Sequence, residues 1–443
     1  MAKAAAPHQF YIGVVGLDPN GRRFARALAK QRLSVAAYDR NAANIKALRD
    51  EAPGISIHIA ASLTEFMRSL RPSRTIVLSG SDAVNDLSSE LFGQLEAEDL
   101  LIDAGNCYFK DCGHRARYLA DRKIRYLGMG ITCGGVAECY GPVLMVGGRP
   151  EIYQSVRLLL EPLAAKVDGE PCVSHLGPAV AGHFVRMVHD GIEYGLRQIV
   201  LETFELLKRT LTLDADELRA VTSAWHMGAL DGSPRDDPAR WTFQAARELD
   251  VHAPTIAAAV GMRTLSELEK RNEFATTPFR QPLGHFGDDE ESILAELHGA
   301  LCAAVMITYA QGIAVLTAGS ERYGFGMEPA EVIRLWKGCC NMRVELLHEI
   351  AGAVQATPNL SNLLFDEDLS EKVMVQQERL RHAVWRAGLL QTPIPALMAS
   401  LDYLDSYRDV WLPVNLIQVS QTRRYSPVPF SAKEELQLDW NHR

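Results

Sequence analysis

The chain has 443 residues, a length that accommodates two or three domains with separate cores. Hydrophobic residues make up 47% and charged residues 23%, a composition typical of globular proteins that excludes a wholly disordered chain. The formal net charge is −9, so no basic field favours a nucleic acid or an anionic membrane as a partner.

The apolar segments and the cysteines indicate a protein without an anchor or a disulfide framework. The N-terminal residues lack a basic start followed by an apolar core, so no secretory signal is visible. The longest apolar stretch, 300–319, contains Thr308, Tyr309 and Gln311, and we interpret it as a buried helix rather than a membrane span. Eight cysteines in a chain of this length form no disulfide framework. We therefore expect a cytoplasmic protein.

The first ~175 residues alternate short β-branched runs with helical segments, which predicts a parallel α/β sheet. Each predicted strand is bounded by turn or breaker residues. The strands are expected at Tyr11–Val15, Val35–Tyr38, Thr75–Leu78, Leu100–Asp103 and Ile124–Leu127.

Long segments with a helical spacing of apolar residues follow from about residue 177 onward, and strand-like runs nearly vanish. The clearest of them are Ala179–Arg209, Asp289–Arg322, Pro329–Ile350 and Glu367–Leu390. The sequence therefore predicts an α/β plus all-α protein. Its expected parts are a Rossmann-like doubly wound domain over residues 1–178, an all-helical domain over 179–420 and a C-terminal tail over 421–443.

A glycine-containing turn follows the first predicted strand and leads into a helix. The run Gly16-Leu17-Asp18-Pro19-Asn20-Gly21 has the spacing of a dinucleotide-binding fingerprint. Its middle position is ordinarily small, because the backbone must approach the pyrophosphate. Here it is Asp18, whose carboxylate repels phosphates unless the loop turns it outward.

The second predicted strand ends in Asp39-Arg40, about twenty residues after the glycine turn. Asp39 is placed to bind a ribose hydroxyl, and Arg40 to neutralise a 2′-phosphate or to stack on adenine. The sequence therefore predicts a nucleotide site in which Asp18 weakens binding. The alternative is a doubly wound domain that keeps its fold and binds a cofactor poorly.

Four polar residues share one face of the predicted helix 179–209. Arg186, His189, Asp190 and Glu193 are spaced 0, 3, 4 and 7, which places them on one side of a helix. This pattern is typical of a cleft-facing site and equally of an ion-pair stripe on a packed helix.

The helix sequence from Gly182 to Gly195 resembles the signature helix of the 6-phosphogluconate dehydrogenase family. Further matching stretches span almost the whole chain in the family's order: Gly105-Asn106, Tyr140-Gly141-Pro142, Leu144-Met145, Gly147-Gly148, Thr308–Gly312, Leu335-Trp336, Leu412-Pro413 and Leu416-Ile417-Gln418. The resemblance implies an NADP-binding domain, with NAD as an alternative cofactor, followed by a large all-helical domain. It also implies a homodimer, in which a tail over roughly Leu412–Phe430 packs on the partner.

The resemblance also implies roles for individual residues. In the family a helix lysine takes the proton of the substrate 3-hydroxyl while a hydride passes to NADP, and after decarboxylation a glutamate on that helix protonates the enediol. Arg186 matches the lysine, Glu193 the glutamate and His189 a site residue, and Asp190 stands where the family carries asparagine. The implied cofactor-binding residues are Gly16, Leu17, Asp18, Asn20, Gly21, Asp39, Arg40 and Asn106. The implied substrate-binding residues are Asn106, Thr132, Cys133, Gly134, His189, Tyr194 and Arg263.

Several substitutions run against the family's reaction. An arginine, with a pKa above ~12, cannot act as a general base, although it can hold a carboxylate or phosphate through two hydrogen bonds. The family's Ser-Gly-Gly-Glu-Glu loop is replaced by the residues 132–136, in which Cys133 stands for a glycine. The tail histidine is absent, and the tail arginine is lost unless Arg423 or Arg424 substitutes for it.

Four cysteines fall in the segment expected to line the cleft, with His114 nearby: Cys107, Cys112, Cys133 and Cys139. Their spacing is too loose for a recognised zinc pattern, so we predict no metal site and interpret them as core residues. A nucleophilic or redox role for Cys133 is the alternative.

Three functional hypotheses follow. The first is a diverged NAD(P)-linked oxidoreductase acting on a carboxylated and optionally phosphorylated, sugar-acid-like substrate, and not an efficient classical 6-phosphogluconate dehydrogenase. The second is a catalytically inactive paralogue that binds a ligand or a partner protein. The third is non-redox chemistry in the same cleft. Asp18 and Arg186 discriminate among them, because the first governs cofactor binding and the second governs proton abstraction.

Overall fold

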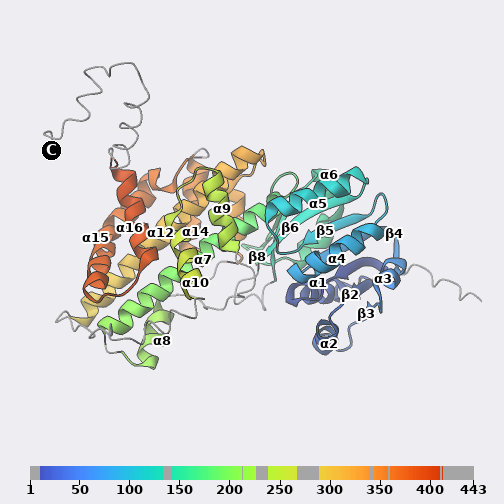
Figure 1. Ribbon diagram of the computed structural model, residues 1–443, viewed down its shortest axis with the longest axis horizontal. Helices are drawn as coiled ribbons and strands as arrows, with labels where there is room; N and C mark the ends of the chain where they lie inside the picture. The colour runs from blue at the N-terminus through green and yellow to red at the C-terminus, as the bar shows by residue number, and fades with distance from the viewer. Residues whose placement is uncertain are drawn as a thin grey trace, which may run out of the picture.

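The computed structural model describes residues 10–132, 141–211, 213–225, 238–266, 289–339, 344–357, 360–409 and 412. Figure 1 shows the sheet and its helices at one end of the molecule and the remaining helices at the other. This arrangement confirms the predicted α/β plus all-α fold.

Eight strands form one sheet in the order β10-β7-β6-β5-β4-β1-β2-β3. They are β1 (Phe10–Val15), β2 (Val35–Tyr38), β3 (Ile57–Ile59), β4 (Leu70–Ser79), β5 (Leu100–Ala104), β6 (Arg125–Thr132), β7 (Val143–Gly148) and β10 (Val173–His175). Neighbouring strands are parallel except β6 and β7. A separate antiparallel pair is formed by β8 (Lys166–Val167) and β9 (Glu170–Pro171). The strand order reverses between β1 and β4, the point at which doubly wound sheets bind ligands.

Six helices accompany the sheet in sequence. They are α1 (Pro19–Lys30), α2 (Ala42–Glu51), α3 (Leu63–Ser69), α4 (Ser81–Gln94), α5 (Phe109–Asp121) and α6 (Pro150–Leu160). The strands β5 and β7 are buried along their whole length, as expected of strands inside a sheet that helices cover on both faces, whereas the first half of β4 is polar and mostly exposed. All five predicted strands are present, and β3, β7 and β10 were not predicted.

The described residues beyond position 179 contain helices and no strand. The helices are α7 (Ala181–Thr210), α8 (Ala215–Ala224), α9 (Pro238–Glu248), α10 (Pro254–Ser266), α12 (Glu290–Tyr323), α13 (Pro329–Trp336), α14 (Val344–Ala356), α15 (Glu367–Leu389) and α16 (Pro395–Arg408). The prediction of one helical segment at Pro329–Ile350 is wrong, because α13 ends at Trp336 and a turn follows. Gly338 lies in that turn and packs against Cys172, where a side chain would clash with the sulfur atom.

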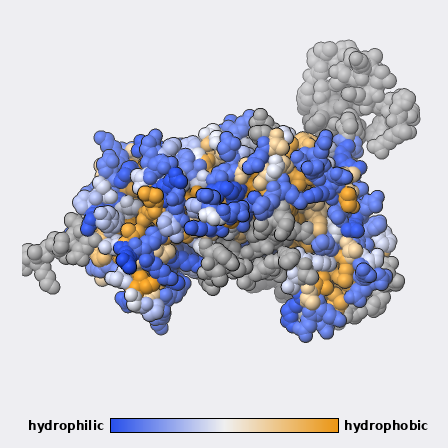
Figure 2. Space-filling view, turned by 180° about the vertical axis from the view of Figure 1, so that it is seen from behind, coloured by the Kyte–Doolittle hydropathy of each residue, from blue (hydrophilic) through white to orange (hydrophobic). Residues whose placement is uncertain are grey.

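The helix α12 contains the apolar stretch interpreted above as a core segment. Asp289 caps its N-terminus, and it ends at Gly324 in a left-handed conformation. It is long and apolar enough to cross a membrane, but 89% of its apolar window is buried inside the protein. On the face drawn in Figure 2, hydrophilic residues predominate and the apolar patches form no continuous belt. The interpretation as a buried core helix is therefore confirmed.

The first turns of α7 cross β6 and β7 at backbone contact distance. A Cβ atom on Gly130 of β6 would lie 2.4 Å from the carbonyl oxygen of Gly182 and 2.6 Å from the Cβ atom of Arg186. A Cβ atom on Gly182 would lie 2.1 Å from the carbonyl oxygen of Met145. Only glycine fits at these two positions. The crossing therefore fixes where the polar face of α7 meets the sheet.

Candidate functional site

The turn between β1 and α1 brings Gly16 and Gly21 into direct contact. Gly16 has a φ of +86°, and a Cβ atom on Gly21 would lie 1.9 Å from the carbonyl oxygen of Gly16. Leu17 between them is fully buried, and Asn20 lies in the first turn of α1. The two glycines thus allow the close strand–helix approach that the fingerprint requires.

The Asp18 carboxylate points at the N-terminus of α1 and is not turned outward. Its Oδ1 accepts hydrogen bonds from the backbone nitrogen of Gly21 at 3.0 Å and from Ser79 Oγ at 2.7 Å. Because Ser79 ends β4, this side chain lies between β1 and β4, where the strand order reverses. Asp18 is the N-cap of α1, and its negative charge occupies the position at which a helix N-terminus attracts anions.

Asp39 holds the end of β2 against the glycine turn. Its Oδ2 accepts hydrogen bonds from the backbone nitrogen of Leu17 at 2.6 Å and from Asn44 Nδ2 at 3.0 Å, and its Oδ1 accepts one from the backbone nitrogen of Asn41 at 2.7 Å. The residue is only 9% exposed. These bonds give Asp39 a structural role, and ribose binding stays a prediction for it.

Arg40 follows Asp39 on the surface and pairs with Glu90 of α4. Its side chain is 51% exposed, and an ion pair between exposed groups contributes no more than about 1 kcal/mol. The guanidinium can therefore exchange Glu90 for a phosphate at little cost. The residues at this reversal of the strand order fit a dinucleotide, because the Gly16–Gly21 contact admits the backbone approach and Arg40 supplies a cation, while Asp18 opposes the phosphates.

Three of the four polar residues on α7 form a continuous chain of contacts. Arg186 Nη2 lies 3.2 Å from Asp190 Oδ2, and Asp190 Oδ1 lies 3.3 Å from His189 Nδ1. His189 Nε2 in turn lies 3.3 Å from the sulfur of Cys339, which is 150 residues further along the chain. Helical spacing predicted that Arg186, His189 and Asp190 share one face of the helix, whereas nothing in the sequence indicated the contact with Cys339.

Charge neutralisation governs the ionisation of Asp190. Burial alone would raise its pKa, but the Arg186 guanidinium and then His189 hold the pKa of this carboxyl below its ordinary value. At neutral pH the pair is therefore a carboxylate and a guanidinium. Their side chains are 19% and 16% exposed, so a small ligand can reach them.

Arg186 retains hydrogen-bonding capacity beyond this ion pair. Its Nε is buried and has no hydrogen-bond partner among the residues that the structure describes. Glu193 and Tyr194 lie about two turns further along α7, where both are half-buried. One carboxylate oxygen of Glu193 is shielded from solvent. This face can therefore bind an anion at Arg186 and presents a carboxyl group along the same helix.

The other predicted substrate residues come from three elements. Asn106 lies half-buried in the loop between β5 and α5. Thr132 ends β6 two residues after Gly130, so both lie on the face of the strand that contacts Arg186. Arg263 lies in the last turn of α10, which packs against α7. The predictions for Cys133 and Gly134 fall outside the described residues.

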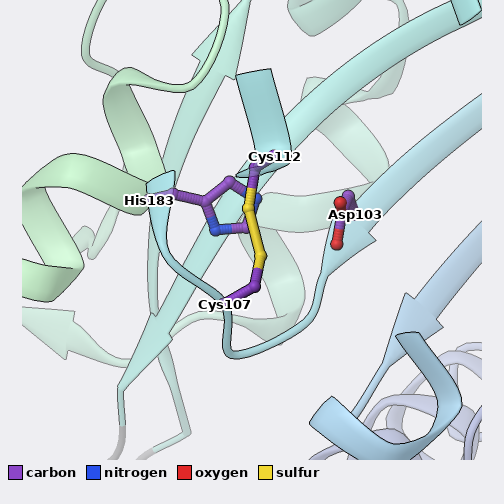
Figure 3. Close-up of side chains that lie close together, drawn as sticks. All are labelled: Asp103, Cys107, Cys112 and His183. Carbon is purple, nitrogen blue, oxygen red and sulfur yellow. A yellow bond between two sulfur atoms is a disulfide. The ribbon is translucent and has the colours of Figure 1, made fainter. Parts of the chain in front are cut away.

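Cys112 is a fully buried core residue and Cys107 packs against the core, as interpreted, but the disulfide between them was not expected. These two cysteines form a disulfide beside His183 of α7, as Figure 3 shows. The sequence signal was present, since the two lie five residues apart at the start of a helix. Cys172 and Cys339 are buried thiols.

Two family models match this chain and together cover most of it. The NAD binding domain of 6-phosphogluconate dehydrogenase matches residues 11–177, and the C-terminal domain of 6-phosphogluconate dehydrogenase matches residues 182–233 and 235–422.

Individual relatives agree with the family models. The chain is 34% identical to the NADP(+)-dependent, decarboxylating 6-phosphogluconate dehydrogenase of Bacillus subtilis, over 93% of this chain and 94% of the relative. It is also 34% identical to the decarboxylating 6-phosphogluconate dehydrogenase of Synechococcus elongatus, with the same coverage. The solved structure of Plasmodium falciparum 6-phosphogluconate dehydrogenase, studied with its cofactor NADP+ and its substrate, superimposes with a TM-score of 0.83. That match has 26% identity and covers 93% of this chain and 95% of the other.

We expect Asp18→Asn to strengthen NADPH binding. Asparagine caps a helix as well as aspartate does, so the Gly21 hydrogen bond is kept while the charge beside the phosphates is removed. The gain should be on the order of 1–3 kcal/mol, measured by fluorescence titration of the purified protein. Asp18→Ala is the control, because it also removes the charge but loses the cap and should lower the melting temperature. Unchanged NADPH affinity in both variants would show that the carboxylate does not face the phosphates.

In the same titration, Arg40→Ala should weaken the binding of NADPH and leave the binding of NADH unaffected.

The second expectation concerns pH and the buried His183. Burial lowers the pKa of His183 from 6.5 to about 4, so the folded protein holds it neutral. The unfolded chain binds the proton near pH 6.5, so the stabilisation is complete above that value and is lost as the pH falls toward 4. The free energy of unfolding should fall by about 2 kcal/mol between about pH 7.5 and about pH 5 through this residue.

Urea unfolding at both pH values measures this contribution as the difference between wild type and His183→Gln. The exposed His382 of α15 provides the matched control, and His382→Gln should keep the wild-type pH dependence. An identical pH dependence in wild type and His183→Gln would contradict the expectation.

Proposed function

The chain belongs to the 6-phosphogluconate dehydrogenase family, and we propose that it is an NADP-linked oxidoreductase for a carboxylated, sugar-acid-like substrate that does not efficiently oxidise 6-phosphogluconate. The observation that carries this proposal is the ion pair between Arg186 and Asp190 on the polar face of α7. By resemblance, the position of Arg186 is the one that holds the lysine base in the family. The substrate can also carry a phosphate.

Arg186 cannot remove the hydroxyl proton of a substrate. A guanidinium stays protonated at neutral pH, and this one is paired with the Asp190 carboxylate. Asp190 is a poor substitute, because its lowered pKa makes it a weak base. His189 is bound on both ring nitrogens, by Asp190 and by Cys339. Oxidation of an alcohol at this place therefore lacks the base that the family uses.

Arg186 is suited to bind and polarise an acceptor oxygen. Its planar guanidinium offers parallel donors to a carboxylate, and its buried Nε has no hydrogen-bond partner among the described residues. In the reductive direction the same donors stabilise negative charge that develops on a carbonyl oxygen. The bound nicotinamide cofactor supplies the hydride. Glu193 is the proton donor in this proposal, since it lies on the same helix with one oxygen shielded from water.

The remaining contacts with substrate are assigned by position. Asn106, Thr132, Tyr194 and Arg263 come from the β5–α5 loop, β6, α7 and α10, and α7 packs against both β6 and α10. Cys133 and Gly134 continue the chain beyond Thr132. We assign all of these residues to substrate binding together with His189.

An inactive paralogue is the second candidate, and one observation favours it. The contacts from Arg186 through Asp190 and His189 to Cys339 tie α7 to the turn after α13 and stabilise the fold without any ligand. In that case Arg186 is a structural residue. Its replacement would change stability and leave ligand binding unaffected.

The Arg186 prediction separates these candidates. We expect neither wild type nor Arg186→Lys to oxidise 6-phosphogluconate at a useful rate, because the substrate loop and the tail remain altered in both. In calorimetry with gluconate and 6-phosphogluconate as probes, Arg186→Ala should weaken the better-bound probe by about 2–4 kcal/mol through loss of a charge-assisted pair.

Arg209→Ala is the matched control. Arg209 lies on the same helix and also pairs with a carboxylate four residues away, Glu205, but it is about 35 Å further along the axis. Its loss should leave probe binding unchanged. Ordinary turnover of 6-phosphogluconate by the wild type would overturn the proposal, and equal probe binding by wild type and Arg186→Ala would favour the inactive paralogue.

We also propose a homodimer, on the basis of the resemblance alone. The residues expected to pack on the partner, from Leu412 to Phe430, fall outside the described residues except for Leu412. Light scattering on the full chain should give twice the mass of one chain. A chain ending near Pro413 should dissociate more readily, and a dimer of unchanged stability would contradict the role of the tail.

A further inference from the structure

A disulfide closes the loop that follows β5. The disulfide joins Cys107, in the loop before α5, to Cys112, in the first turn of α5, and Asn106 directly precedes Cys107. Cys112 is fully buried and Cys107 is half-buried. In Figure 3 the sulfur–sulfur bond passes beside the imidazole of His183, with Asp103 to one side. The two sulfurs, one Asp103 oxygen and one His183 nitrogen all lie within 4.8 Å of one another.

A guanidinium lies against both sulfur atoms. Arg115 Nη2 is 2.6 Å from Cys107 Sγ and 3.1 Å from Cys112 Sγ, and its Nε donates to Asp103 Oδ2 at 3.1 Å. Tyr126 donates to the same carboxylate oxygen at 3.0 Å. A fixed positive charge beside cysteines favours the thiolate, which is both the attacking and the leaving form in thiol–disulfide exchange.

The buried imidazole beside the disulfide is unsatisfied. His183 is 2% exposed, and its Nε2 has no hydrogen-bond partner among the described residues. Because its pKa is about 4, the ring is neutral and carries one donor and one acceptor nitrogen. A disulfide cannot donate a hydrogen bond, whereas a thiol can. The dithiol state therefore offers His183 a partner that the disulfide state lacks.

We propose that Cys107 and Cys112 form a reversible thiol–disulfide modification site, which reacts with low-molecular-weight thiols and disulfides and controls the order of the loop carrying Asn106. The loop residues 105–108 belong to no helix or strand. The described contacts that hold them include the hydrogen bond from the backbone nitrogen of Gly105 to Asp103 and the disulfide itself. Opening the disulfide removes the covalent tie.

The exchange proceeds in two balanced steps. An external thiolate attacks Cys107 Sγ, the more accessible sulfur, so that the Cys107–Cys112 bond breaks and Cys112 leaves as a thiolate beside Arg115. A second external thiolate attacks the external sulfur of the mixed disulfide and releases Cys107 as a thiolate. The two protons of the external thiols pass through water to the protein thiolates. In total, one protein disulfide and two thiols become one protein dithiol and one external disulfide.

The same four residues have the donor types of a zinc site, and Arg115 decides against that alternative. A divalent cation among these ligands would share Asp103 and both sulfurs with a guanidinium that already contacts all three. Two positive groups at that distance repel each other strongly. The arginine instead stabilises the thiolates that form when the disulfide is reduced.

The test uses the full chain, equilibrated in mixtures of oxidised and reduced dithiothreitol and then alkylated. Peptide masses should show Cys107 and Cys112 changing together and reversibly in the folded protein. Cys302→Ser is the matched control, since it removes a half-buried cysteine elsewhere and should leave this titration unchanged. Hydrogen exchange of residues 105–108 should be at least tenfold faster in the reduced protein.

Two cysteine variants and a measurement of NADPH binding complete the experiment. Cys112→Ser should show the fast hydrogen exchange at every dithiothreitol ratio. If that variant does not fold, Cys107→Ser, which replaces the half-buried cysteine, provides the same test. NADPH should bind three- to tenfold more weakly to the reduced protein, an expectation that rests on the cofactor contact that the family resemblance implies for Asn106. If NADPH binds neither state, the proposed function fails, and the exchange rates still test the modification site.

Three results would overturn the inference. The first is a pair that reacts only after unfolding. The second is an exchange rate for residues 105–108, or an NADPH affinity, that is equal in both states. The third is stoichiometric binding of Zn²⁺ by the reduced protein that disappears in Cys112→Ser, because it would make this cluster a metal site.

Discussion

The backbone contact between α7 and the strands β6 and β7 determines where the polar face of α7 lies. Gly130 and Gly182 leave no space for a side chain, so the helix axis is fixed at van der Waals distance from the sheet. His183 and Arg186 follow within one turn of that contact. Their side chains therefore emerge beside the ends of β5 and β6, which hold Asp103 and Thr132. A helix displaced by one side-chain width would separate the Arg186 face from both strands.

The sequence predicts the elements whose signals are local. The strand Val35–Tyr38 and the long helices α7, α12 and α15 end within two residues of their expected limits, because alternation, helical spacing and caps are read from adjacent residues. The strands β3 and β10 have three residues each and no alternation to detect. In the turn after α13, Gly338 packs against Cys172, which lies 166 positions away in the chain. Such long-range contacts cannot be predicted from the pattern of adjacent residues.

In the candidate site, too, some features follow from local sequence patterns and others depend on contacts between distant segments. Helical spacing was sufficient to bring Arg186, His189 and Asp190 together, and the glycine fingerprint was sufficient to place Gly21 against Gly16. The tie between His189 and Cys339 required the folded chain. So did the three hydrogen bonds that turn Asp39 toward its own loop, and the Ser79 contact that holds Asp18 over the helix N-terminus. Each of these joins elements whose distance is set by packing rather than by spacing.

Two arginine–carboxylate pairs flank His183, and their burial assigns them different roles. Arg115 binds Asp103, a fully buried carboxylate that Tyr126 also contacts, so this guanidinium is committed to the protein interior. Arg186 binds Asp190, and both side chains are partly exposed. An incoming carboxylate can displace Asp190 from Arg186, since water is available to solvate the released group. Displacing Asp103 from Arg115 would leave a buried charge unpaired. The anion-binding group at this junction is therefore Arg186, while Arg115 remains beside the two sulfurs whatever ligand is bound.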